Sequence, residues 1–377
     1  MKQLFNFMSI MILQNTEKSW CWRWRTMIKK ITLAESELWN QIISTFDDVD
    51  IYYTAEHAQL YKIHGDGEPI LIYYYDDFIR AINVVMLRDI AHSGLFNGLP
   101  ENTYFDIATP YGYGGMLIQG TNSEHSMFKL KQEYLEFCRN NSIISEFVRF
   151  HPILENYKKS ATLYNITEIG PNITIKLESK EAIQVSYENS NRRNINKAKK
   201  NKLDVYLSND PALVDTFMSI YKETMDRDDA TEYYYFEKEY YDYLFDALKQ
   251  NVLFAYVKKD DSIIAMSIFY LYNSKIHYHL SASKTDYTSL YPTNLLIDFM
   301  AHWGSEHGFT EMMLGGGLGG REDNLFRFKR KFNKNFDRKF YIGQRIFDKE
   351  MYEKLVKLRG EELKDLETNY FPKYRKP

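Results

Sequence analysis

A run of glycines late in the chain is the first pattern that suggests chemistry. Gly315, Gly316, Gly317, Gly319 and Gly320 fill five of six positions directly after an apolar segment typical of a strand. A backbone without side chains can be approached closely by a ligand. Because a basic segment follows at once, the pattern favours a pocket for an acyl- or phosphate-bearing ligand. The alternative is a loop whose glycines only relieve crowding. A dinucleotide fingerprint is less favoured, because no alternating series of strands and helices follows.

The segment after the glycines could supply fixed cations. Residues 321–345 contain nine Arg or Lys and three Asp or Glu. Phenylalanines alternate with these charges and would pin the backbone, so that Lys329 and Lys331 project from a held scaffold. Cations held in this way stabilise a developing oxyanion or a phosphate. A plain solvated surface is the alternative.

A second basic cluster precedes the middle of the chain. Residues 192–202 hold six cations and no acid, and on a helix Arg193, Lys197 and Lys200 share one face. Phosphates of a nucleotide, a lipid diphosphate or RNA would suit such a face. An exposed basic helix without a ligand is the alternative.

A polar break at Arg227 and Asp228 precedes tyrosines 233–235. This combination could line a substrate cleft, or it could only cap a helix and pack. Neither a Gly-x-Ser-x-Gly motif nor a metal-type histidine spacing occurs, so we expect no nucleophile triad and no metal.

Composition limits the class of protein. The 377 residues are 44% hydrophobic and 26% charged, as in a folded domain or two. The formal charge of −3 argues against DNA as a partner. Cys21 and Cys138 form no CxxC pattern, which fits a reducing cytoplasm. The apolar stretch 4–13 is too short to span a membrane, and we expect no transmembrane segment. We interpret residues 1–26 as a mis-called extension that precedes the true start at Met27.

Two similar series of elements must position these residues. Each series reads as a hairpin of two long strands, a third strand, a turn, a helix and a further strand, over residues 70–150 and 252–315. Short strands are also expected at 51–54 and 57–63. An α+β fold of two copies of one unit, packed side by side, is therefore predicted.

Several motifs, in order, resemble those of the FemAB-like acyltransferases of the GNAT superfamily. The resemblance covers about residues 50–345. It rests on the following segments: 104–115 (YFDIATPYGYGG), 192–200, 221–228 (YKETMDRD), 281–283 with Tyr287, 290–296 (LYPTNLL), the glycine run and 328–332 (FKRKF). It implies two tandem GNAT-like domains with mixed, mostly antiparallel sheets flanked by helices. It also implies transfer of an acyl or aminoacyl group to an amine.

The resemblance further implies site residues. Lys329 matches the lysine on which the family relies, with Lys331 in reserve, and Arg227 matches a substrate-contacting arginine. The segment 289–294 replaces the usual coenzyme A loop, although the helix start at Asn294 still offers N–H groups for a phosphate. The helical hairpin of the tRNA-dependent cross-bridge enzymes is also absent.

We therefore expect a cytoplasmic acyltransferase with domains at 27–165 and 166–345 and a C-terminal helix within 346–377 that packs on the body. No cofactor is permanently bound, and acyl-CoA or aminoacyl-tRNA is the co-substrate. The acceptor is an amine of a cell-envelope precursor, a nucleotide- or lipid-linked amino sugar or muropeptide. A small-molecule or lipid-linked glycan is therefore the expected partner, and tRNA and peripheral membrane contact remain open. A degenerate, non-catalytic GNAT module and direct RNA binding through residues 192–202 are the alternatives. The expected acceptor-binding residues are Tyr111, Tyr113, Arg193, Arg227, Asp228 and Tyr287; the expected donor-binding residues are Asn294, Gly315, Gly316, Gly317 and Gly319.

Overall fold

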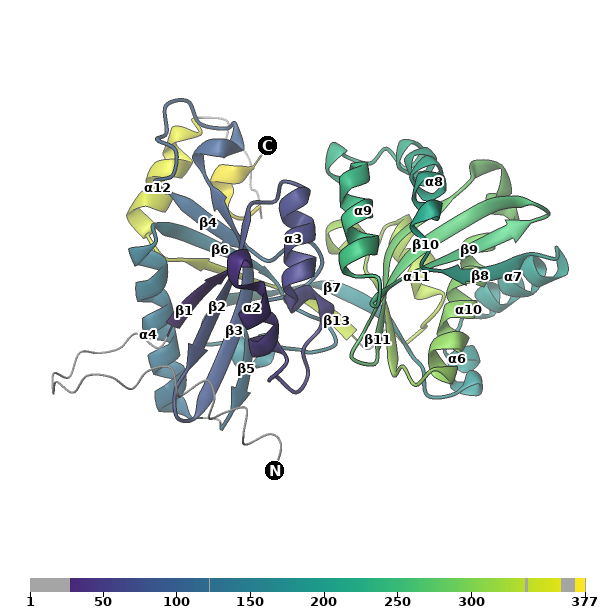
Figure 1. Cartoon of the computed structure of the whole chain (residues 1–377), viewed down its shortest axis with the longest axis horizontal. Helices are drawn as coiled ribbons and strands as arrows, with labels where there is room; N and C mark the ends of the chain where they lie inside the picture. The colour runs from purple at the N-terminus through teal and green to yellow at the C-terminus, as the bar shows by residue number, and fades with distance from the viewer. Residues whose placement is uncertain (1–27, 122, 336–337, 361–369, 377) are drawn as a thin grey trace.

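The computed structural model describes residues 28–121, 123–335, 338–360 and 370–376. The proposed extension, residues 1–26, lies outside these ranges. The described residues form two halves that lie side by side (Figure 1). The strands are β1 (Ile28–Thr32), β2 (Glu68–Tyr75), β3 (Ile79–Asp89), β4 (Phe105–Ala108), β5 (Leu117–Gly120), β6 (Ile143–Arg149), β7 (Asn165–Lys176), β8 (Asp204–Ser208), β9 (Val252–Lys259), β10 (Ser262–Tyr272), β11 (Lys275–Ser283), β12 (Glu311–Gly315) and β13 (Arg338–Ile346). The helices are α2 (Ser36–Ile43), α3 (Ala55–Ile63), α4 (Glu124–Asn140), α5 (Tyr157–Ser160), α6 (Lys180–Ser186), α7 (Asn189–Lys200), α8 (Val214–Arg227), α9 (Lys238–Ala247), α10 (Pro292–Glu306), α11 (Asn324–Arg330) and α12 (Lys349–Leu358).

The strands form one mixed sheet in the order β1-β2-β3-β4-β6-β13-β7-β12-β11-β10-β9-β8, with β5 paired to β3. The predicted repeat is confirmed by the pairing. In each half a hairpin (β2–β3 or β9–β10) is followed by an antiparallel third strand. A helix then leads to a parallel strand, so that β4 pairs with β6 and β11 with β12. The mixed α/β architecture with helices against the sheet therefore agrees with the predicted α+β fold.

β7 and β13 join the two halves. β7 pairs with β13 along its first part and with β12 along its last part. β13 falls within the range expected for the second domain, yet it pairs with β6 of the first half. The chain thus returns to the first half, where α12 packs against β6. The buried Tyr374 hydroxyl lies 2.8 Å from the Ser145 hydroxyl and donates to Asp106 at 3.0 Å.

The helices cover the sheet in three groups. α2 and α3 of the first half share one hydrophobic core with α8 and α9 of the second, and α3 and α9 contact each other. α6, α7 and α10 cover the opposite face of the second half, while α4 covers the opposite face of the first. Among the described residues, none of the helices combines the length and apolar character required to cross a bilayer.

The expected strands at 51–54 and 57–63 are wrong. Residues Ile51–Tyr53 form a 3-10 turn, and α3 begins at Ala55, where the Thr54 hydroxyl accepts a hydrogen bond from the His57 N–H at 3.2 Å. α3 is buried on most sides, and a short helix buried all round shows no clear helical period.

Candidate functional site

The end of β12 brings a lysine and a tyrosine against bare backbone. Lys329 Nζ donates a hydrogen bond to the carbonyl oxygen of Gly316 at 2.9 Å. A Cβ atom placed on Gly315, which has a φ of +84°, would lie 3.3 Å from Lys329 Nζ and 3.5 Å from Tyr113 Oη. Only a glycine combines this backbone angle with so close an approach. The lysine comes from the second half and the tyrosine from the first, so the site lies between the halves.

Lys329 is held by the start of its own helix. Asp323 caps α11 by accepting from the Phe326 N–H at 2.8 Å, and it also accepts from the Leu318 N–H in the glycine segment at 2.8 Å. Burial lowers the pKa of Lys329 to about 8, against the opposing effect of the Asp323 charge. The ammonium is therefore present at neutral pH, but it is poorly solvated and can interact strongly with a developing negative charge.

Two glycines of the run serve packing. A Cβ on Gly317 would lie 2.0 Å from the Arg321 carbonyl oxygen, and one on Gly320 would lie 2.1 Å from Ile169 Cγ2. Gly319 has open space around it and a φ of +60°. Of the four glycines expected to bind the donor, Gly315 and Gly316 lie at the lysine, whereas Gly317 folds the loop.

The pairing between β11 and β12 ends before the two strands do. β11 and β12 are paired in parallel only as far as His277 and Met313. β11 then continues to Ser283 and β12 to Gly315. Since the two strands separate there, their backbone groups lack each other as partners, which leaves room for an extended ligand to lie between them.

Tyr113 reaches the site from a tight turn. Asn172 Nδ2 donates to Tyr113 Oη at 2.7 Å, and the tyrosine ring packs edge-on against Tyr52 with centroids 5.6 Å apart. A Cβ on Gly112 would lie 2.4 Å from the Tyr52 ring, so this turn also requires a glycine. Burial raises the pKa of Tyr113 to about 12. Tyr113 is thus a neutral phenol that can donate a hydrogen bond.

A buried cluster behind Tyr52 ties the halves together. Asp50 Oδ1 lies 2.9 Å from His277 Nε2 on β11, and Asp50 Oδ2 lies 3.1 Å from His151 Nε2. These residue types could hold a metal. However, His151 Nδ1 accepts from the N–H groups of Ile153 and Leu154. The proton of a neutral His151 is therefore on Nε2, facing Asp50, and no lone pair remains there for a metal. The cluster is best described as a hydrogen-bonded clamp.

Tyr111 lies in a cluster of aromatic side chains from both halves, the aromatic cluster. Its ring lies within 6.4 Å, between centroids, of rings from both halves: Tyr61, Tyr233, Tyr234 and His279. Side chains of this kind combine apolar faces with hydrogen-bonding ends, which suits a sugar or another polar ring.

Arg227, Asp228 and Tyr287 lie near the end of β11. Arg227 Nη1 donates to the Ser283 carbonyl at 2.9 Å and to the Thr285 hydroxyl at 3.2 Å, and its Nε lies 3.4 Å from Asp228. Tyr287 lies in the following turn, where Lys259 Nζ is 5.8 Å from its ring centroid. Arg227 is thus tied to the end of β11, beyond the pairing of this strand with β12.

The structure does not bring Arg193 together with Tyr111. Arg193 is exposed on α7, which packs against α10 on the face opposite α8 and α9 and lies at the outer edge of the second half in Figure 1. The Asn294 side chain is buried and donates to Asn191 Oδ1 at 2.8 Å, so only its backbone is left for a ligand. Lys331 follows Lys329 by two residues, about 200° around the helix, so its side chain leaves the backbone on a different side from that of Lys329.

Sequence reasoning missed Asp50, Tyr52 and Asn172. None lies in a motif, and each acts through a partner far away in the chain, as with Asp50 and His277. The Gly112 turn was the one available signal, because its close contact with the Tyr52 ring is what places Tyr113.

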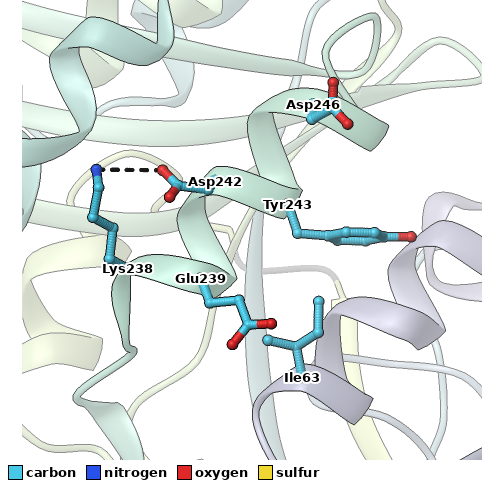
Figure 2. A pocket seen from close by; sticks show the side chains of 6 residues that line it. All are labelled: Ile63, Lys238, Glu239, Asp242, Tyr243 and Asp246. Carbon is cyan, nitrogen blue, oxygen red and sulfur yellow. Dashed lines mark ion pairs between the residues drawn. The ribbon is translucent and has the colours of Figure 1, made fainter.

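A shallow groove elsewhere is not the site. It has a volume of about 480 Å³ and lies between the end of α3 and one side of α9, where Tyr243 extends toward α3 (Figure 2). Three carboxylates line it, and its one cation, Lys238, is paired with Asp242 at 3.3 Å. The groove is acidic, contains no predicted site residue, and would repel a phosphate-bearing donor.

Comparison with known proteins identifies the domain. Residues 186–330 match the family model of the acetyltransferase (GNAT) domain, whereas no curated protein matches the sequence. Among solved structures, FemX is similar over 86% of this chain and 99% of its own, with a TM-score of 0.61 and 14% identity. L-PGS from Bacillus licheniformis is similar over 82% of this chain and 92% of its own, with a TM-score of 0.51 and 14% identity. At these identities the likeness concerns the fold. The matched segment contains the glycine run and Lys329; the chain therefore carries an acetyltransferase (GNAT) domain at residues 186–330, and as a whole it has a fold similar to that of FemX.

Proposed function

We propose that the protein transfers an activated acyl or aminoacyl group to an amine of a cell-envelope precursor in the cytoplasm. The observation that carries the proposal is the convergence of Lys329 Nζ, Gly315 and Tyr113 Oη at the end of β12. The donor lies between the separating ends of β11 and β12, with its carbonyl oxygen beside Lys329. The acceptor lies against the aromatic cluster around Tyr111.

In this proposal the neutral amine attacks the donor carbonyl carbon, and the negative charge on oxygen is stabilised by the Lys329 ammonium and the Tyr113 hydroxyl. The carbon–sulfur or carbon–oxygen bond to the leaving group then breaks. The proton lost by the amine ends on the leaving thiol or alcohol, passing through the acceptor phosphate.

The first turn of α10 supports a donor that carries phosphate. Tyr291 precedes Pro292 without providing a side-chain cap, so N–H groups of this turn are left for a ligand. Asn191, fully buried beside Asn294, has an amide nitrogen without a hydrogen-bond partner. Lys197 Nζ lies 5.1 Å from the centroid of the Tyr291 ring. An oxygen of a phosphate would satisfy these donors.

Aminoacyl-tRNA is the second candidate donor, and the observation that favours it is the basic outer face of α7. Arg193, Lys197 and Lys200 are all exposed there, and a run of phosphates could follow them.

The donor can be identified by thermal shift with coenzyme A, acetyl-CoA and charged tRNA, using Lys197→Gln as the comparison. Stabilisation by coenzyme A that is reduced in Lys197→Gln supports the thioester donor. Stabilisation by charged tRNA that fades steeply with salt supports the alternative. A response to none of these would contradict enzymatic transfer and favour a binding module.

A further inference from the structure

Arg149 lies directly behind the turn that carries Tyr111 and Tyr113. It is the last residue of β6, and its carbonyl oxygen accepts from the Gly114 N–H at 2.8 Å. Its own N–H donates to the Thr109 hydroxyl at 3.2 Å. These backbone contacts hold Arg149 against the turn that places Tyr111 in the aromatic cluster.

The Arg149 guanidinium has no ion-pair partner among the described residues. Nη1 donates to the Thr109 carbonyl at 3.1 Å, and the guanidinium lies 5.3 Å from the centroid of the Phe147 ring. No carboxylate of a described residue forms an ion pair with it. The neighbouring Arg88, by contrast, has Asp106 at 2.7 Å. A half-buried guanidinium with free N–H groups and no ion-pair partner can still donate hydrogen bonds to a bound anion.

The charge of Arg149 acts on side chains of the aromatic cluster. Burial raises the pKa values of Tyr111 and Tyr234, and the charge of Arg149 lowers them. The facing acid is Asp66, whose pKa is raised by burial and which accepts from the Tyr233 hydroxyl at 2.9 Å. The cation therefore acts on the space in which the proposed acceptor lies.

We propose that Arg149 binds an anionic group of the acceptor, a phosphate or a carboxylate, while the tyrosines hold the adjoining ring. The guanidinium can donate two parallel hydrogen bonds to either anion. This inference rests on the proposed function, which supplies the acceptor. Binding of an anion at Arg149 can nevertheless be measured without turnover.

The test measures binding of inorganic diphosphate and of glucuronate by calorimetry, in a Lys197→Gln background that weakens the proposed donor site. Arg149→Gln is compared with Arg80→Gln. Arg80 makes the same two kinds of local contact: it donates a hydrogen bond to the Thr45 carbonyl and stacks on Phe46. It lies on β3, outside the aromatic cluster. Arg149→Lys keeps the charge and removes the two-pronged geometry.

We expect the dissociation constant of one probe to rise about 10- to 100-fold in Arg149→Gln, the usual loss for hydrogen bonds to a charged group. The dissociation constant should rise less in Arg149→Lys, and it should not change in Arg80→Gln. Dependence seen with diphosphate assigns a phosphate, and dependence seen with glucuronate assigns a carboxylate. Equal binding of both probes by Arg149→Gln and Arg80→Gln would overturn the proposal. Failure of the proposed function would instead appear as unchanged transfer after loss of Lys329.

Discussion

The Lys329 ammonium is hydrogen-bonded to the carbonyl oxygen of Gly316, 2.9 Å away and 13 residues earlier in the chain. This bond links α11 to the end of β12, beyond the point where β12 stops pairing with β11. A ligand carbonyl that lies between the two strand ends would meet the same ammonium without a change of backbone. The contact therefore places a cation where transfer from a donor on the strand would need it.

The pH dependence of transfer follows from the pKa of Lys329. At about 8, the protonated fraction falls as the pH rises through this value. Because the ammonium is the required form, we expect kcat/KM to decline above about pH 8. The guanidinium introduced by Lys329→Arg would stay charged, so the profile of this variant should lack the decline, whatever its absolute rate. Profiles from about pH 7 to about pH 9.5 test this, and a rate that rises through pH 8 in the native enzyme would instead make the neutral lysine a base.

Removing the lysine charge should stabilise the fold. The folded-state pKa of Lys329 is below its ordinary value of 10.5 because burial disfavours the cation. Stability is therefore lost as the pH falls from 10.5 through about 8, and the cost is fully present below that. Lys329→Met should thus melt at a higher temperature than the native protein at pH 7, and the difference should shrink as the pH approaches 10.5. Equal melting temperatures throughout would argue against a desolvated ammonium.

Acid should destabilise the contact between the halves. Burial lowers the pKa of His57 to about 3 and also lowers that of His151, so both take up a proton less readily in the folded protein than in the unfolded chain. The unfolded chain takes up these protons as the pH falls below about 6.5, and the free energy of unfolding decreases with it. Urea midpoints at about pH 7.5 and about pH 5.5 should show the loss. His57→Gln should reduce the difference between the two urea midpoints. An unchanged difference would mean that other groups cause the loss of stability in acid.

Gly317 and Gly319 should differ in how well they tolerate substitution by alanine. A Cβ on Gly317 meets the Arg321 carbonyl and Asp323, the cap of the lysine helix, so Gly317→Ala should displace the loop and lower both stability and transfer. Gly319 has open space, and Gly319→Ala should cost only about 1 kcal/mol for its left-handed backbone. Denaturant unfolding of the pair measures this, and an equal cost for both would contradict the packing role of Gly317.

Much of the fold was predictable because its signals are local. The hairpin at Asp76 follows from a turn in which this side chain accepts from the N–H groups of Phe78 and Ile79, and the order of strands in each half repeats. α3 was missed because its buried faces hide the helical period, although Thr54 is a good cap.

The candidate site was predictable only in part. Lys329, the glycines and Tyr113 lie in recognisable sequence motifs. The structure brings Lys329, Gly315, Gly316 and Tyr113 together. Asn172, Asp50 and Arg149 could not be found in the same way, because each depends on contacts across the sheet that the sequence does not encode locally. Arg193 lies on the exposed side of α7, away from Tyr111, because the charge pattern of a segment does not determine which face of the sheet its helix covers.

The most direct test of the account compares the transfer rates of Lys329→Met and Lys331→Met with the identified donor. The two lysines are two residues apart, but only Lys329 bonds to the glycine strand. We expect a loss of about 100-fold in kcat for Lys329→Met, the usual effect of removing one oxyanion donor, and a much smaller loss for Lys331→Met. An unchanged rate in a folded Lys329→Met protein, or a larger loss in Lys331→Met, would contradict this expectation.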